Sequence, residues 1–133
     1  MSKNLWGELP VMDDTVTPLM IMREQANILR HATKSVLHAS ISTTPLALGR
    51  MRHSFYLVAP LLNDYRHLLF QVEHGIEPYP ARVSFLANGE KKRPSVKNQT
   101  AFENLLGLIL KHPDTQKAVS SLMANSRAVG HAG

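Results

Sequence analysis

The sequence contains no cysteine among its 133 residues. That absence excludes a disulfide framework, zinc–thiolate sites and a thiol nucleophile, and it is what a reducing compartment permits. Long apolar runs are missing too, because no stretch approaches the ~18 residues that a transmembrane helix needs. The first residues, MSKNLWGELPVMDD, lack the apolar core of a signal peptide. We therefore expect a cytoplasmic protein with no membrane partner.

Motifs that announce catalysis are also lacking. There is no G-x-S-x-G, no H-E-x-x-H, no glycine-rich phosphate loop and no Walker-type G-K-S/T. Seven histidines are present, but Glu24 and His31 on one helix stripe lie roughly 10 Å apart along the axis, too far to share one zinc ion. The sequence predicts no metal site, no cofactor and no assignable catalytic residue. A small enzyme or ligand-binding domain without a recognisable motif is the third hypothesis.

Positive charge is in modest excess, with 15 Lys and Arg against 10 Asp and Glu. A net charge of +5 and a pI near 9.8 suggest phosphate neutralisation and hence a nucleic-acid partner. The single dense basic cluster is Lys91, Lys92 and Arg93. Because a run of this length is usually a solvated loop, nucleic-acid binding is the runner-up hypothesis.

The most informative stretch is residues 51–75, which predicts a two-stranded antiparallel ribbon. Pairing MRHSFYLVAP with YRHLLFQVEHG places Arg52 opposite Glu73 and Ser54 opposite Gln71. One face is then apolar, with Met51, Phe55, Leu57, Leu68, Phe70 and Val72. Burying each phenylalanine stabilises by roughly 1.5–3 kcal/mol, whereas an exposed ion pair contributes about 0.2–1 kcal/mol. Burial therefore decides the register.

Helical periodicity appears on both sides of this ribbon. A first helix should open at Thr17 with Pro18 at its first position. A second should open at the capping-box pair Thr100 and Glu103, and a shorter third one should be capped by Asp114. Strand alternation predicts further strands over 37–43 and 83–87, with a hairpin through Asn88-Gly89 into residues 90–93.

These elements predict an α+β fold, an antiparallel sheet of about four strands in meander order with an N-terminal helix and two C-terminal helices packed on one face. We expect one domain over residues 17–126, an extended strap over 1–16 and a frayed tail over 127–133. The strap holds the only tryptophan, Trp6. An exposed tryptophan is costly in solubility, so we expect Trp6 to pack back onto the domain, with partner docking as its alternative role.

The uncovered sheet face should be polar, with His67 on it, whereas His53 should lie on the buried face. Two leucines, Leu69 and Leu86, interrupt the polar face, and apolar residues on a wet sheet favour burial by a partner. Our first hypothesis is a non-enzymatic protein-interaction module that self-associates as a homodimer. Its contact residues would be Trp6, Arg52, Tyr56, Leu69 and Leu86. The nucleic-acid hypothesis would instead use Arg52, Tyr56, Arg82, Lys91, Lys92 and Arg93.

Overall fold

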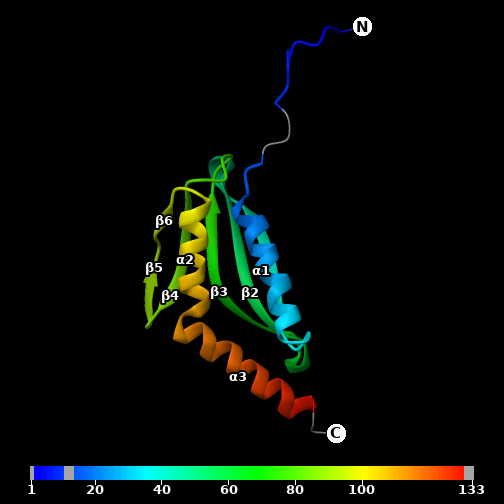
Figure 1. Ribbon diagram of the computed structural model, residues 1–133, viewed down its shortest axis with the longest axis vertical. Coiled ribbons are helices and arrows are strands. Elements are labelled where there is room, and N and C mark those ends of the chain that lie inside the picture. The colour runs from blue at the N-terminus through cyan, green and yellow to red at the C-terminus, as the bar shows by residue number, and fades with distance from the viewer. Residues whose placement is uncertain (1, 11–13, 131–133) are drawn as a thin grey trace.

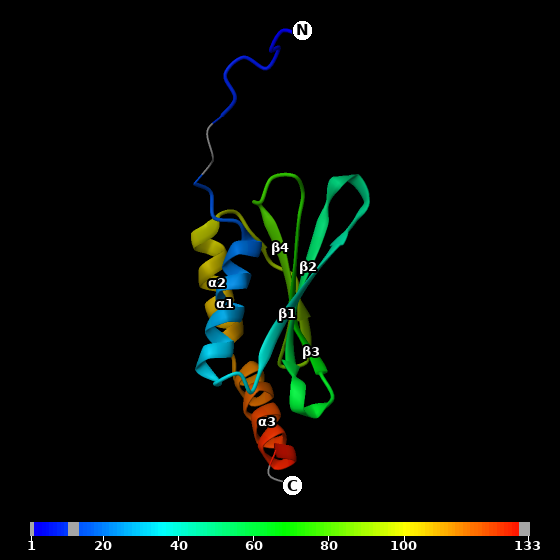
Figure 2. The same ribbon diagram turned by 90° about the vertical axis from the view of Figure 1, so that its right-hand side faces the viewer.

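The computed structural model describes residues 2–10 and 14–130 of the chain. Its elements are α1 (Pro18–Ala32), β1 (His38–Pro45), β2 (Met51–Ala59), β3 (Tyr65–His74), β4 (Ala81–Ala87), β5 (Glu90–Lys92), β6 (Ser95–Val96), α2 (Gln99–Lys111) and α3 (Pro113–Gly130). The strands form one antiparallel sheet in the order β1-β2-β3-β4-β5, and β6 pairs with β4 (Figure 1). Figure 2 shows α1 and α2 on one side of this sheet. The predicted α+β meander with one helix before it and two after it is confirmed.

The ends of α1 follow from two threonines. The Thr17 side chain caps the N-terminus by accepting from the Met20 backbone N–H at 3.3 Å, and Pro18 occupies the first turn, as the sequence predicts. The helix ends at Ala32, because Lys34 and Ser35 take left-handed conformations with φ of 52° and 66°. Thr33 stabilises this end of the helix, because its hydroxyl accepts a hydrogen bond from the Leu37 backbone N–H at 3.1 Å.

The C-terminal helices begin differently from the prediction. Asn98, not Thr100, caps α2, with its side-chain oxygen accepting from the Ala101 N–H at 2.9 Å. Thr100 lies inside the first turn, so the capping-box prediction was wrong in register. At the start of α3, His112 Nδ1 accepts from the Asp114 backbone N–H at 3.0 Å, and the Asp114 carboxylate points elsewhere. With 18 residues, α3 is longer than predicted.

The central ribbon has the predicted register up to one point. Arg52 pairs with Glu73, Ser54 with Gln71, and Phe55 with Phe70. After Phe55 the register shifts, because Tyr56 pairs with Leu68 and leaves Leu69 as an extra residue on β3. This is a β-bulge, which inserts one residue into one strand and increases the local bend and twist.

The bulge reverses three predicted orientations. Leu68, expected in the core, pairs with Tyr56 on the open face and is 44% exposed. Leu69, expected on the open face, packs against the core. His67, also expected on the open face, pairs with Leu57 and therefore faces the helices.

Two adjoining hydrophobic clusters fill the space between sheet and helices. The larger contains Met22 of α1, the stacked rings of Phe55 and Phe70, and Phe102 of α2. The smaller one joins Leu57 and Ala59 of β2 to Leu122 of α3. Each helix thus has its own contact with the sheet.

The segment before α1 is extended where it is described. Residues 2–10 and 14–17 contain no helix or strand. Trp6 is 78% exposed, so the expectation that it packs onto the domain was wrong. At the other end of the chain, α3 continues to Gly130. Across the described ranges, every helix is too short or too polar to cross a lipid bilayer.

Candidate functional site

A cleft opens where β4 parts from β3. The two strands pair only between Phe70–Glu73 and Arg82–Phe85, whereas β3 continues back to Tyr65. Residues 65–68 of β3 pair with β2 on one side, and residues 65–69 leave their other edge without a strand partner among the described residues. The bulge at Leu69 lies directly beside this parting point, and a bulge bends and twists the strand that carries it. We call the opening the β3/β4 cleft.

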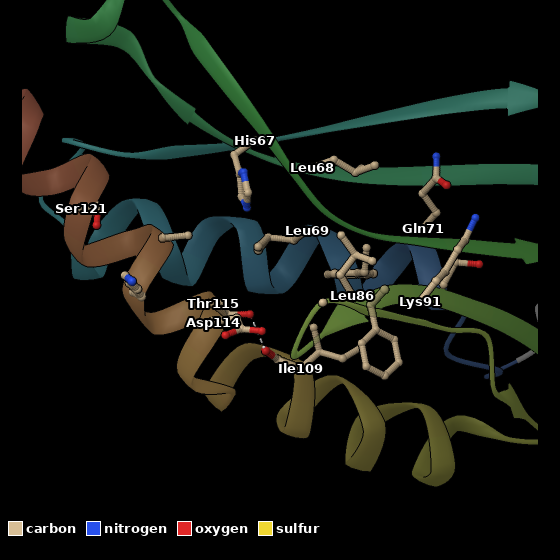
Figure 3. Close-up of a pocket in the computed structure, with 16 residues that line it drawn as sticks. His67, Leu68, Leu69, Gln71, Leu86, Lys91, Ile109, Asp114, Thr115 and Ser121 are labelled. Carbon is tan, nitrogen blue, oxygen red and sulfur yellow. Dashed lines mark hydrogen bonds between the residues drawn. The ribbon is translucent and has the colours of Figure 1, made fainter.

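The cleft has a volume of about 650 Å³, within the range of roughly 300–1,000 Å³ that ligand sites occupy. Figure 3 shows side chains from β3, the β4–β5 hairpin and the junction of α2 with α3 around it. Its lining residues are His67, Leu68, Leu69, Phe70, Gln71, Ser84, Phe85, Leu86, Gly89, Lys91, Ile109, Asp114, Thr115, Lys117, Ala118 and Ser121. Most of the lining surface is apolar, and the charged side chains Lys91, Asp114 and Lys117 are exposed.

Hydrogen bonds hold the walls of the cleft in place. The Asp114 carboxylate accepts from the Asn88 backbone N–H at 2.9 Å, which fastens the β4–β5 turn to the start of α3. Asn88 takes a left-handed conformation with φ of 53°, the turn geometry expected for Asn-Gly. Thr115 Oγ1 donates to the Ile109 carbonyl at 2.7 Å across the α2–α3 junction. The cleft is therefore formed by fixed backbone elements.

The rim of the cleft is basic. Lys91 and Lys117 are exposed cleft residues, and neither forms a salt bridge in the part of the chain that the structure describes. The one carboxylate in the lining, Asp114, is already engaged by Asn88. An apolar interior with a cationic rim suits a segment that carries apolar side chains and a carboxylate.

Two of the predicted contact residues belong to this cleft. Leu86 lies on the open face, is 66% exposed and lines the cleft mouth. Leu69 lines its inner side. Leu68 was not predicted as a cleft residue. The run Leu68-Leu69-Phe70 is apolar throughout, so its sequence does not show which of the two leucines faces the core. Trp6, in contrast, lies on the strap and is not among the residues that line the cleft.

Arg52 and Tyr56 lie on the open face, but local contacts engage both. Glu73, with a side chain only 14% exposed, pairs with Arg52 Nη2 at 3.3 Å and with Arg93 Nη2 at 3.6 Å. The guanidinium of Arg66 lies 4.0 Å from the centre of the Tyr56 ring. One carboxylate thus offsets two of the cations, and an arginine covers one side of the Tyr56 ring.

The remaining basic residues are divided between the two faces. Arg82 shares the open face with Glu73, and Lys91 shares it with Leu86. Lys92 pairs with Phe85 on the other face and forms a 2.9 Å salt bridge with Glu90. The predicted Lys91–Arg93 cluster is therefore not one continuous surface.

A second polar site, a pair of buried histidines that the sequence did not predict to be in contact, lies on strands β2 and β3. His53 and His74 are 1% and 7% exposed, and their Nε2 atoms are 2.8 Å apart. The Gly75 carbonyl, 2.8 Å from His74 Nδ1, can only accept, so neutral His74 is protonated on Nδ1 and accepts at Nε2 from His53. His53 Nδ1 then accepts from the Thr43 hydroxyl at 2.8 Å.

The surroundings of His53 favour its neutral form. Burial, the adjacent His74 and, to a smaller extent, Arg23 lower the pKa of His53 below its usual value. His53 faces the core as expected, opposite Val72. No group of three or more His, Cys, Asp or Glu side chains that could hold a metal ion occurs within residues 2–10 and 14–130.

Comparison with protein-family models, curated proteins and solved structures found no match to this chain. The assignment of a function therefore depends on the geometry of the cleft, the open face and the strap.

Proposed function

We propose that this protein is a non-enzymatic protein-interaction module that binds an extended polypeptide segment in the β3/β4 cleft. The observation that carries the proposal is the unpaired edge of β3 at residues 65–69, directly beside an apolar cleft of about 650 Å³. A strand edge offers backbone donors and acceptors to an incoming strand, and an adjoining pocket selects its side chains.

The exposed apolar residues around the cleft support this function. Leu68 and Leu86 are 44% and 66% exposed, and both line the mouth of the cleft. Tyr65, at the start of the same β3 edge, is 53% exposed. Apolar side chains that gather beside a groove mark a docking surface more often than isolated ones do. Lys91 and Lys117 at the rim would favour acidic residues in the bound segment.

Peptide selection from a random display library, followed by calorimetry with synthetic peptides, tests this function. We expect selected peptides to carry a large apolar anchor and a carboxylate, and to bind Leu86→Asp at least about ten-fold more weakly, because a buried leucine contributes about 1.5–3 kcal/mol. Ile76→Asp is the matched control, since Ile76 is 95% exposed and lies in the loop after β3, outside the cleft. Equal loss in both variants, or no loss in Leu86→Asp, would contradict the proposal.

Nucleic-acid binding is a second candidate, favoured by one observation. The open face carries Arg52, Arg66, Arg82 and Lys91 against the single carboxylate of Glu73. Such binding weakens steeply as salt rises, whereas docking of an apolar segment hardly responds. Charge reversal at Arg66, Arg82 and Lys91 should then reduce retention on single-stranded nucleic acid; unchanged retention would rule this candidate out.

A further inference from the structure

The strap presents apolar side chains on a small preformed turn. Asn4 Oδ1 accepts from the Trp6 backbone N–H at 3.0 Å, Asn4 Nδ2 donates to the Gly7 carbonyl at 3.4 Å, and Gly7 has φ of +67°. On this turn Leu5 is 90% exposed and Trp6 78% exposed, and Leu9 follows with 63%. Tryptophan and leucine placed together in solvent favour burial against a partner.

The base of the strap, directly before α1, is held against the domain. The Tyr79 hydroxyl donates to the Val16 carbonyl at 2.9 Å, and Val16 packs against the larger core cluster. The strap therefore leaves the domain at the end where α1 and α2 begin (Figures 1 and 2). The β3/β4 cleft adjoins the other end, where α2 meets α3.

The strap and the cleft are complementary. The strap offers two adjacent apolar side chains and, two residues later, the carboxylate of Glu8. The cleft offers an apolar interior with Lys91 and Lys117 at its rim. Opposite charges around an apolar contact fix the register of binding more than they add to its affinity.

Building on the function proposed above, we propose that the occupant of the β3/β4 cleft is the strap of a second copy of this chain. Leu5 and Trp6 enter the cleft of the partner, and Glu8 lies against its lysine rim. Because each copy carries one strap and one cleft, at opposite ends, two copies can exchange straps reciprocally and close a two-fold dimer.

The strap could in principle reach the cleft of its own chain. The 13-residue α2 spans about 20 Å, whereas the eleven residue-to-residue steps from Trp6 to Thr17 span up to about 36 Å when fully extended. The test must therefore separate exchange between copies from folding back within one copy.

The single tryptophan makes that separation direct. The fluorescence emission of Trp6 and the mass of the full chain, the latter from light scattering, are both measured over micromolar to millimolar concentrations. We expect the mass to rise from 14.8 kDa towards that of a dimer, with a blue shift of Trp6 emission at the same midpoint. A blue shift that is independent of concentration in a 14.8 kDa species would mean folding back and overturn the proposal. So would a dimer in which Trp6 emission stays that of a solvated indole, or a monomer throughout.

Complementation between two variants gives an independent test. Trp6→Ser removes the anchor but leaves a cleft, and Leu86→Asp blocks the cleft but leaves the anchor. Each alone should raise the dimer dissociation constant at least about ten-fold, whereas Ile76→Asp should not. Mixing the two should restore one contact, with a blue shift from the tryptophan of the Leu86→Asp chain. No shift on mixing would overturn the exchange.

The outcomes also separate this inference from the function on which it rests. If library peptides bind in a Leu86-dependent manner while Trp6→Ser leaves the mass and the affinity unchanged, the cleft binds another protein and the strap inference fails alone. If no peptide binds and Leu86→Asp changes nothing, both fail.

Discussion

The stacked pair of Phe55 and Phe70 provides the sharpest test of the fold. Their ring centres are 4.9 Å apart with planes 14° from parallel, and the side chains are 2% and 1% exposed. Each Phe→Leu change should lower the free energy of unfolding by about 1–3 kcal/mol, through lost burial and incomplete repacking. Domains of this kind unfold with about 5–15 kcal/mol, so both single variants should remain folded.

The double variant measures the contact itself. Offset aromatic pairs contribute about 0.5–1.5 kcal/mol beyond their buried area, so the double variant should be less destabilised than the sum of the single variants by that amount. Equilibrium urea unfolding, with m-values checked for equality, gives the four free energies. Phe70→Leu combined with Leu37→Ala is the control, because Leu37 belongs to the other core cluster and the two effects should add. Coupling below about 0.3 kcal/mol between Phe55 and Phe70 would refute the stacked ribbon.

Two further predictions concern buried polar groups. Because its pKa is lowered in the folded state, His53 binds a proton more readily when the protein is unfolded. The free energy of unfolding should therefore be constant above about pH 7.5 and fall as the pH drops through 6.5 towards the folded pKa. In unfolding titrations His53→Gln should flatten this dependence and the exposed His31→Gln should not; an equal slope in all three proteins would contradict the assignment. Thr33→Val should leave the buried Leu37 N–H without its acceptor and lower the free energy of unfolding by about 1–3 kcal/mol, while Thr44→Val, on an exposed residue, should change thermal unfolding little; similar shifts in both would contradict the cap.

Side-chain alternation was sufficient to predict the ribbon only where the two faces differ in polarity. The predicted pairs Arg52–Glu73 and Ser54–Gln71 are confirmed. They could be predicted because a one-residue slip of the register there would bury charged side chains. Beyond the Phe55–Phe70 pair, β3 contains the apolar run Leu68-Leu69-Phe70. Such a run is compatible with the register with a bulge and with the register without one, so the sequence carried no sign of the bulge.

The candidate site was predicted in part for the same reason. Leu86 was identified because strand alternation places it on the otherwise polar face, but its position near α3 depends on a contact between Asn88 and Asp114. That contact joins residues 26 positions apart in the chain, which no local pattern encodes. His53 was expected in the core, but its pairing with His74 follows from register and not from spacing.

The extra residue at Leu69 also bears on how the cleft can change. The bulge exists because β3 has one residue more than β2 past the Phe55–Phe70 pair, so a substitution along β3 that keeps its polarity can alter what the cleft accepts while the opening itself persists. Deletion of Leu69 would remove the bulge and leave the pairing on either side of it unchanged, with Leu68 still opposite Tyr56 on the open face and His67 still opposite Leu57. Deletion of Leu69 should thus be tolerated better than deletion of a residue within 71–73, which would shift the register of β3 against both neighbouring strands.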